Sequence, residues 1–527
     1  MFKTVKLSPL IALAMSIFAP DAPLGATEID GFLVRPAEAP KTMELEAAPI
    51  YLPEILRHLR GLRPPERVDK PQIKVTRGIV GKSIPHRFLK HASVESLHGG
   101  STEDTPALFL ARGTVSIREL SKSGVASKLV KCQGHICDLN APLFVGKDAT
   151  LIIDGVTLRM HRGKGAFLVS LGTLYIARSH VFTPFEADCA FESPYTSFRP
   201  FIAAMTGSHT VALSSTFTDL GYHAPKAYGF SVHAGKSEAP PSAVLAGNVF
   251  EGLYYGFYSH HARDVSIVGN IYRDNIIYGI DPHDYSENLH ILGNRAYGTK
   301  KKHGIVISRG VTGTTISGNL SYKNNGTGIM LDRHSNGNLV SFNVVSENGI
   351  DGISILESSD SRIVGNTAFE NVKAGLRVRN GRELLIAKNN VISNGAFGTI
   401  LYSGEPNGVA RRKEDVFELR TNATLISNYV TGNGTTDLQL KGCVDRIAFD
   451  LTRGRQPGFI DREVGLPSNP AWRAVLTRLR DTSGSHATIS YACPDSPGLI
   501  TPAGVKKSKG KRGMETCSPT DEVLSLN

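Results

Sequence analysis

Three ionisable side chains, Asp281, His283 and Asp284, lie together in the segment YGIDPHD and could carry out acid–base chemistry. Histidine changes its protonation near neutral pH, so His283 is the natural general base of the three. A neighbouring carboxylate, from Asp281 or Asp284, could hold the imidazole ring in one tautomer. A lone histidine is more often structural, but a histidine flanked by two acids indicates a catalytic site.

Basic side chains follow this segment and could bind an anionic partner. The basic residues that follow His283 in the sequence include Lys302, Arg309 and Arg333. Two more, Arg377 and Arg379, follow later in the chain. A guanidinium group binds a carboxylate through two parallel hydrogen bonds and keeps its charge. A column of arginines could equally be a solvated face, so the positions of these residues in the fold decide between the two interpretations.

The elements that must position these residues form an internal repeat. Asparagine and glycine each recur every 22 to 25 residues in the middle of the chain. The recurring residues are Asn248, Asn270, Asn294, Asn319, Asn343, Asn366 and Asn389, and Gly256, Gly279, Gly304, Gly328, Gly352, Gly375 and Gly398. Alternating segments such as GIVIS, GIMLD and GISIL follow most of the glycines. Alternation with a period of two inside this repeat predicts the coils of a parallel β-helix, whereas a leucine-rich frame is not seen and a propeller blade needs ~40 residues.

Stacked asparagines are expected at the turns of such a solenoid. Asparagine tolerates a left-handed backbone and can hydrogen-bond along the stack. The fold class predicted from the repeat is therefore all-β, a parallel β-helix with small helical caps at both ends.

Counting from each repeat glycine aligns the coils. Positions +1 and +3 are apolar and point inward, so positions +2 and +4 must point outward. Position +4 holds His283, Ser308, Asp332, Leu356 and Arg379, and position +5 holds Asp284, Arg309, Arg333, Glu357 and Asn380. Because neighbouring coils are ~4.8 Å apart, His283 is expected within one or two coils of Arg309 and Arg333.

Pro282 breaks the repeat in the coil that carries Asp281, His283 and Asp284. Proline has no N–H to donate and is normally excluded from the interior of a sheet, and sequences tend to break local rules at functional sites. Tyr278 precedes the repeat glycine of the same coil. Lys302 and His303 precede the next repeat glycine, where one extra residue indicates a bulge that brings lysines to the same edge.

The repeat assigns residues 105–440 to the β-helix, interrupted at residues 406–420 by a basic excursion loop where a lid would be found. Residues 27–104 are expected to form an N-terminal cap region, since the ends of a solenoid must be covered. Its helix carries Leu52, Ile55, Leu56 and Leu59 on one face. Residues 441–527 are expected to form a C-terminal cap, with a helix beginning at Asn469-Pro470 and a solvated basic tail.

Composition and the N-terminus indicate an exported protein with an anionic partner. Residues 1–26 have the charged, apolar and small-residue regions of a secretory signal peptide, and no later apolar run is long enough to span a membrane. Cys132 and Cys137 could close a short loop and Cys493 and Cys517 could staple the tail, while no cysteine set has the spacing of a zinc site. The formal net charge is +11 over 527 residues.

The segments DPHD, AYGTKKKHGIVISR and GIMLDRHSNGN resemble those of the periplasmic mannuronan C-5-epimerases of bacterial alginate biosynthesis, closely over residues 245–405. The resemblance implies a right-handed parallel β-helix that converts β-D-mannuronate to α-L-guluronate within the polymer. It implies that His283 is the base and that Arg309 neutralises the substrate carboxylate. The partners it implies are polymannuronate and other periplasmic export-complex proteins, not nucleic acid. The calcium-binding nonapeptides of the extracellular relatives do not occur here, so no metal or other cofactor is implied.

Epimerisation at C5 requires removal of a proton next to an ionised carboxylate, and a cation on that carboxylate stabilises the charge that develops. Reprotonation must come from the opposite face of the sugar ring, for which Tyr278, His303 and water are candidates. The candidates for binding neighbouring uronates are Lys302, His303, Asp332, Arg333, Arg377 and Arg379. Two alternatives stay open: a polysaccharide lyase, in which the same intermediate expels the 4-O-linked sugar, and a non-catalytic β-helix that binds the polymer during export.

Overall fold

The computed structural model describes residues 27–29, 32–37, 52–66, 69–76, 106–186, 193–195, 197–406, 411–450 and 486–491. The predicted signal peptide, the helix expected after Asn469-Pro470, the Cys493–Cys517 pair and the basic tail lie outside these residues. Within the described ranges, no helix has the length and apolar character needed to cross a membrane.

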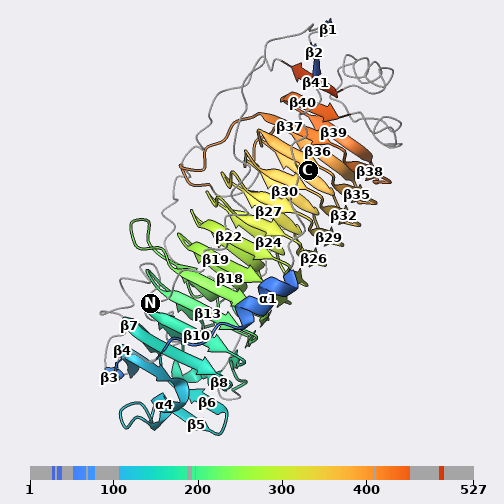
Figure 1. Ribbon diagram of the computed structural model, residues 1–527. Coiled ribbons are helices and arrows are strands. Elements are labelled where there is room, and N and C mark those ends of the chain that lie inside the picture. The colour runs from blue at the N-terminus through green and yellow to red at the C-terminus, as the bar shows by residue number, and fades with distance from the viewer. Residues whose placement is uncertain are drawn as a thin grey trace, which may run out of the picture.

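Three rows of parallel strands wind into one long solenoid (Figure 1). Row A consists of β9 (Leu168–Ser170), β12 (Ile202–Ala204), β15 (Gly229–His233), β18 (Tyr255–His260), β21 (Tyr278–His283), β24 (Ile305–Ser308), β27 (Ile329–Asp332), β30 (Ile353–Leu356), β33 (Leu376–Arg379), β36 (Phe397–Tyr402) and β39 (Thr436–Lys441). Row B consists of β10 (Thr173–Ala177), β13 (His209–Leu213), β16 (Ser242–Ala246), β19 (Arg263–Val268), β22 (Glu287–Leu292), β25 (Thr315–Ser317), β28 (Leu339–Ser341), β31 (Arg362–Val364), β34 (Leu384–Ala387), β37 (Thr421–Ile426) and β40 (Val444–Asp450). Row C consists of β6 (Ile136–Leu139), β8 (Thr157–Met160), β11 (His180–Phe182), β14 (Thr216–Thr218), β17 (Val249–Glu251), β20 (Ile271–Arg273), β23 (Arg295–Tyr297), β26 (Leu320–Tyr322), β29 (Val344–Ser346), β32 (Thr367–Phe369), β35 (Asn390–Ile392) and β38 (Tyr429–Thr431). Each coil contributes one strand to each row, so residues one repeat apart lie side by side.

The interior is filled by the two columns that the repeat predicts to point inward. The side chains are Ile280, Ile305, Ile329, Ile353 and Leu376 at position +1 and Ile307, Leu331, Ile355 and Val378 at position +3, and all are buried. Burying one such side chain contributes roughly 1.5–3 kcal/mol, and the contribution recurs in every coil. The apolar stacking confirms the register on which the outward-facing columns depend.

Buried asparagines join successive coils at the turn from row B to row C. Nδ2 of Asn294 donates to Oδ1 of Asn319 at 2.9 Å, and the backbone N–H of Asn294 donates to the same oxygen. The ladder runs through Asn248, Asn270, Asn294, Asn319, Asn343, Asn366, Asn389 and Asn428. A second ladder, not predicted from the sequence, connects Asn324, Asn348, Asn371, Asn394 and Asn433. The asparagines are thus internal hydrogen-bonding groups.

The left-handed backbone expected of these asparagines belongs to the residue before them. Gly293 precedes Asn294 and has φ 59°, and Phe342 precedes Asn343 and has φ 54°. The repeat glycines serve a different purpose, because a Cβ at Gly279 would collide with the carbonyl oxygen of Gly304 in the next coil. The glycine column therefore permits close contact between coils.

The first end of the solenoid is closed by a short helix and a hairpin. β4 (Ala107–Ser116) leads into α4 (Ile117–Lys122), whose Ile117 and Leu120 are buried in the main core. β3 (Gln72–Thr76) pairs antiparallel with β4, and the long β7 (Leu143–Asp154) joins rows A and B by pairing with β9 and β10. The hairpin of β5 (Val130–Gln133) and β6 carries the predicted Cys132–Cys137 disulfide. A 3₁₀ turn, η2 (Arg162–Lys164), follows β8.

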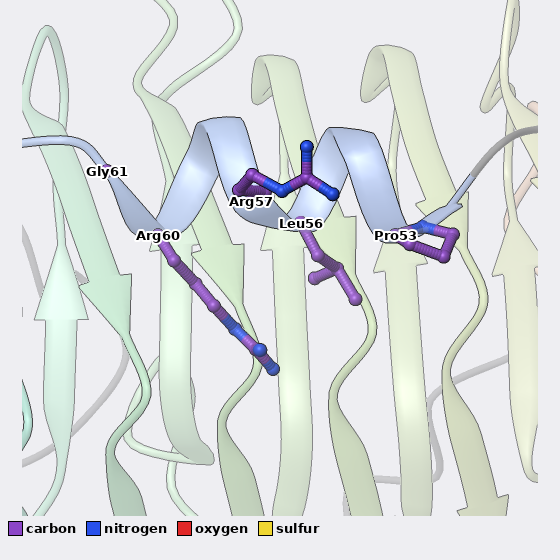
Figure 2. Close-up of a pocket in the computed structure, with 5 residues that line it drawn as sticks. All are labelled: Pro53, Leu56, Arg57, Arg60 and Gly61. Carbon is purple, nitrogen blue, oxygen red and sulfur yellow. The ribbon is translucent and has the colours of Figure 1, made fainter.

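The helix predicted at the N-terminus forms as α1 (Leu52–Arg60), but it lies along the side of the solenoid (Figure 1). Its apolar face, Ile55, Leu56 and Leu59, packs on outward-facing aliphatic side chains of row B, including Val268 and Leu292. The prediction that it caps an end is wrong, because row B carries an apolar outer stripe and this helix covers it. The hollow beside α1 is lined by Pro53, Leu56, Arg57, Arg60 and Gly61 (Figure 2) and contains none of the predicted catalytic residues.

Residues 27–37, assigned from the sequence to the N-terminal cap region, pair at the C-terminal end of the solenoid. β41 (His486–Tyr491) lies antiparallel between β40 and β2 (Phe32–Ala37), and β2 pairs with β1 (Thr27–Ile29). A free edge strand presents unpaired backbone groups, so these added strands cover the edge that β40 would otherwise expose.

Candidate functional site

His283 stands at the end of β21 in row A and faces outward. The pairing of β21 with β24 joins Ile280 to Ile305 and His283 to Ser308, and Pro282 lies between these pairs. Since Pro282 cannot donate a hydrogen bond, the strand is anchored on either side of it. Asp284 follows with φ 38°, in a turn position shared by Arg309 (φ 60°) and Arg333 (φ 50°) in the next two coils.

The carboxylate of Asp284 lies beside one ring nitrogen of His283. Nδ1 of His283 lies 2.9 Å from Oδ2 of Asp284, whose side chain is only 3% exposed. Burial alone would raise the pKa of Asp284, but His283 and Arg412 outweigh it and hold this pKa well below its ordinary value. An ionised Asp284 favours the tautomer with the proton on Nδ1, which leaves Nε2 of His283 as an available base.

A second histidine, not among the residues predicted from the sequence, lies near this carboxylate. His260 is paired with His283 in register, and its Nε2 lies 3.5 Å from Oδ2 of Asp284. Its Nδ1 lies 2.9 Å from the carbonyl oxygen of Ala234, so Nδ1 carries a proton. The sequence does contain a pattern that predicts this position of His260. Counting from Gly256 places His260 at position +4 of the preceding coil, the position that His283 has in its own coil.

Asp281 also faces outward, and it is buried. Its side chain is 2% exposed, and within the described part of the chain its Oδ1 has no hydrogen-bond partner. Burial raises the pKa of Asp281 to about 7. Asp281 is therefore a titrating acid next to the histidine, whereas Asp284 stays ionised.

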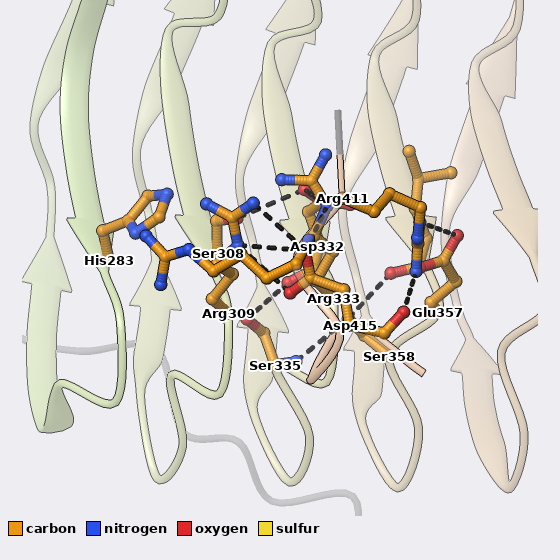
Figure 3. A network of polar contacts seen from close by, with 12 residues as sticks. His283, Ser308, Arg309, Asp332, Arg333, Ser335, Glu357, Ser358, Arg411 and Asp415 are labelled. Carbon is orange, nitrogen blue, oxygen red and sulfur yellow. Dashed lines mark hydrogen bonds and ion pairs between the residues drawn. The ribbon is translucent and has the colours of Figure 1, made fainter. Parts of the chain in front are cut away.

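Arg309 is bound by an acid far away in sequence. Its Nε lies 3.1 Å from Oδ1 of Asp415, and its Nη2 lies 3.1 Å from Oδ2 of the same carboxylate. Arg333 lies nearby, with its Nε 3.9 Å from Oδ2 of Asp415 and 3.5 Å from Oδ2 of Asp332 (Figure 3). The predicted proximity of His283, Arg309 and Arg333 is thus observed, and an additional carboxylate lies among them.

The additional carboxylate belongs to residues 411–420, the described second part of the excursion loop, which we call the strap. Arg412 of the strap contacts Asp284 at 2.6 Å, and Arg411 contacts Glu357 at 2.6 Å. The chain leaves row A after β36, yet Asp284 lies after β21, five coils earlier. The strap therefore lies over the candidate site, and its residues Arg411, Arg412 and Asp415 were not foreseen individually.

Arg377 and Arg379, expected to bind substrate, are already paired with acids of the solenoid. Arg377 donates to both oxygens of Asp351 at 2.7 and 2.9 Å, and Arg379 donates to Glu357 at 2.9 Å. Both lie on β33, four coils from β21, which is ~19 Å at the usual strand spacing. Asp332, on β27, accepts from Ser308 at 3.2 Å, and burial raises its pKa.

Tyr278, Lys302 and His303 gather at the other edge of row A. The rings of Tyr278 and His303 are stacked with centroids 5.7 Å apart, and Nζ of Lys302 lies 5.6 Å from the Tyr278 ring. Burial and the charge of Asp281 raise the pKa of Tyr278 far above its ordinary value, so the phenol stays protonated. Burial, reinforced by Lys302, lowers the pKa of His303 to about 4, and its Nδ1 accepts from the backbone N–H of Thr327. His303 is therefore neutral at pH 7.

The extra residue before Gly304 lies in the turn that precedes β24, and Lys300, Lys301 and Lys302 are exposed there. No group of three or more histidine, cysteine or acidic residues able to hold a metal ion occurs in the ranges that the structure describes. The site brings together a histidine, a buried acid, two arginines and a phenol.

Two family models match parts of the chain. One, described as "Right handed beta helix region", matches residues 297–413, and one described as "Periplasmic copper-binding protein (NosD)" matches residues 199–340. The first agrees with the parallel coils and gives the solenoid its right-handed sense.

Similar proteins match most of the chain. A mannuronan C5-epimerase of Pseudomonas putida is 32% identical over 429 residues, covering 76% of this chain and 81% of that protein. The mannuronan C5-epimerase AlgG of Azotobacter vinelandii is 36% identical, covering 63% and 66%, and that of Pseudomonas aeruginosa is 33% identical, covering 70% and 72%. The crystal structure of the periplasmic alginate epimerase AlgG is similar with a TM-score of 0.66 at 29% identity, covering 76% of this chain and 97% of that one.

Proposed function

The chain belongs to the mannuronan C5-epimerase family, and on this premise we propose that it inverts C5 of β-D-mannuronate within polymannuronate, with His283 as the base. Inversion at C5 leaves the atomic composition of the sugar unchanged, so the enzyme is an isomerase. One observation carries the assignment of the catalytic residues. Asp284 contacts Nδ1 of His283, and Arg309 lies in the next coil.

The chemical difficulty lies in the acidity of the C5 proton. The neighbouring carboxylate is ionised, so removing the proton places a second negative charge on the same group of atoms. A fixed cation against the carboxylate oxygens stabilises this charge as it develops. Arg309 suits this role because its planar group matches a carboxylate and stays protonated.

His283 would remove the proton through Nε2. Asp284 would keep the other ring nitrogen protonated and stabilise the imidazolium ion that forms, so its contribution is to orient and to balance charge. The outward position of His283 at the end of β21 supports this role, since the ring is 18% exposed and can approach a bound polymer.

Tyr278 is the protein side chain best suited to return a proton from the opposite face. Its hydroxyl group keeps its proton at neutral pH, and a strongly basic carbanion can take a proton from a phenol. His303 is less suited because it is neutral and its Nδ1 already accepts from Thr327. Water remains the other candidate, and a Tyr278→Phe variant with unchanged turnover would favour it.

Neighbouring sugars would be bound by the basic residues along row A. Lys302 and Arg333 are the nearest of these to β21, and Lys302 is exposed. His303 and Asp332 would bind beside Lys302 and Arg333, their neighbours in the chain. Arg377 and Arg379 would line more distant positions, where both would have to share their charge with Asp351 and Glu357.

We further propose that the protein acts in the periplasm after removal of a signal peptide at residues 1–26. The similar crystal structure is that of a periplasmic alginate epimerase, which supports this location. Polymannuronate in alginate biosynthesis would be the substrate, and other proteins of the export complex would be partners.

The deciding experiment incubates polymannuronate with the protein in deuterated water and follows the sugar by NMR. An epimerase gives guluronate signals with deuterium at C5, a lyase gives unsaturated ends, and a binding protein gives neither. His283→Ala should lose turnover by about a thousandfold or more while keeping the β-sheet circular dichroism signal. His58→Ala, on the exposed face of α1, is the matched control and should behave as wild type. Substantial turnover by folded His283→Ala would exclude His283 as the base.

A further inference from the structure

The carboxylate of Asp415 occupies the position on Arg309 that the proposed function gives to the substrate. Two nitrogens of the Arg309 guanidinium group face the two oxygens of Asp415, each at 3.1 Å. This forked arrangement is the one by which arginine binds any carboxylate, a uronate included. Arg309 and a sugar carboxylate could not adopt the same contact while Asp415 remains in place.

We propose that the strap is a displaceable closing element, in which Asp415 takes the place of the substrate carboxylate until polymannuronate displaces it. The inference rests on the proposed role of Arg309 and adds to it an internal competitor. The structure is then the closed form of the enzyme.

The attachments of the strap over the site are ionic. Asp415 contacts Arg309 and Arg411 contacts Glu357 (Figure 3). Arg412 contacts Asp284. The apolar anchor of the strap is Phe417, which is buried and lies after all three ionic residues. A polyanion can therefore replace the ionic contacts while Phe417 keeps the base of the strap attached.

Charge balance makes the exchange selective for an anionic polymer. Burial raises the pKa of Asp415, but hydrogen bonds from Arg309 and from the backbone N–H of Arg412 outweigh it and lower this pKa below its ordinary value. Asp415 therefore stays ionised on Arg309 at neutral pH. If it left without replacement, Arg309 and Arg333, whose side chains are 14% and 12% exposed, would lose a counter-ion in a nearly buried site. A uronate carboxylate restores the balance, whereas a neutral polysaccharide cannot.

The first test compares Asp415→Asn with Glu414→Gln. Both substitutions remove one negative charge from the strap, but Glu414 is exposed, whereas Asp415 is buried against Arg309. Polymannuronate binding is measured in a His283→Ala background, so that turnover does not interfere. We expect Asp415→Asn to lower the Kd by about tenfold, the factor expected if the strap covers the site about nine-tenths of the time. Glu414→Gln should leave the Kd within about twofold of its parent, because general electrostatics alone change little when one exposed charge is lost.

The second test follows hydrogen exchange in the peptide that spans residues 411–420. Oligomannuronate should accelerate exchange of this peptide, and dextran of similar length should not. Slower exchange on adding oligomannuronate would mean that the strap closes over the polymer, and this result would overturn the proposal.

In the otherwise wild-type enzyme, Asp415→Asn should lower KM with kcat kept within about twofold. A tenfold loss of kcat at unchanged KM would make Asp415 a positioning residue for Arg309 and would also overturn the proposal. Failure of the proposed function has a different signature, because wild type would then form no guluronate although the binding and exchange measurements could still be made.

Discussion

At the scale of single residues, Asp281 and Asp284 have pKa values shifted in opposite directions although they are three positions apart. Both are buried, which by itself raises the pKa of a carboxyl group. Asp284 contacts His283 and Arg412, and these partners lower its pKa, whereas burial raises the pKa of Asp281 to about 7. Separated values of this kind allow two neighbouring acids to take different roles.

The first residue-scale prediction concerns Arg309→Lys. Lysine keeps the charge but cannot present two parallel donors to one carboxylate. We expect kcat/KM for polymannuronate to fall by about a hundredfold, the usual cost of removing a preorganised donor from a developing anion. The control is Arg263→Lys on β19, where the exposed Arg263–Glu287 pair should tolerate lysine. Near-normal turnover by Arg309→Lys would refute the neutralising role of Arg309.

The second concerns stability and pH. The pKa of Asp281 is about 7 in the native state against 3.8 for the free side chain, so between these pH values the native state binds more protons than the unfolded state. Stability must then fall as pH rises from about 4 to about 7, by at most about 4 kcal/mol from this group. Asp281→Asn removes this loss and should unfold at a higher temperature than wild type at pH 8, with little difference at pH 4.

The check is thermal unfolding by circular dichroism at both pH values, with the exposed Asp148→Asn as control. If the difference in Tm between Asp281→Asn and wild type is the same at pH 4 and pH 8, Asp281 does not titrate in this range.

At the scale of elements, side-chain ladders hold each turn to the next. Asn319 accepts from the backbone N–H and Nδ2 of Asn294, and its own Nδ2 donates to Oδ1 of Asn343. A buried polar group without a partner costs about 1–3 kcal/mol. Each asparagine therefore fixes the spacing of two coils, including those that carry His283 and Arg309.

Asn319→Ala should lower the free energy of unfolding by about 2–4 kcal/mol, because it leaves two donors of Asn294 unpaired in the interior. The measurement is urea unfolding followed by circular dichroism. Asn390→Ala is the control, since Asn390 is exposed on β35 and should cost less than about 0.5 kcal/mol. Equal losses for the two variants would show that the ladder contributes no more than a surface asparagine.

At the scale of the whole molecule, the solenoid places residues that are one repeat apart in sequence next to one another on its surface. Residues one repeat apart stand side by side along row A, so basic residues from Lys302 to Arg379 can face one extended polymer. The strap adds a contact that ignores the repeat, since Arg309 and Asp415 are 106 residues apart and Arg412 and Asp284 are 128 apart. The candidate site thus combines residues that the repeat places side by side with residues of the strap, which are distant in sequence.

Because the proposed substrate is a polyanion and the net charge is +11, binding should weaken with salt. The screening length falls from about 10 Å at 0.1 M to about 3 Å at 1 M ionic strength. We expect KM for polymannuronate to rise by about tenfold between these concentrations while kcat stays within about twofold. Sucrose of equal osmolarity is the control, and a KM that does not respond to salt would contradict electrostatic binding along row A.

The sequence by itself determined the solenoid, its register and the neighbourhood of His283, Arg309 and Arg333. It could do so because hydrogen bonds between coils repeat at a fixed spacing, so a position within the repeat becomes a position in space. The same count would also have found His260, had it been extended one coil backwards.

Only the tertiary structure decided which acid holds His283, which group binds Arg309 and where α1 lies. Both Asp281 and Asp284 lie close to His283 in the sequence, so spacing alone cannot assign their roles. Their different contacts in the folded protein distinguish them. The contact of Asp415 with Arg309 and the packing of α1 on row B join segments that no repeat relates. Such contacts depend on how far an irregular segment extends and on which surface of the solenoid is left uncovered. A repeating sequence pattern predicts neither of these.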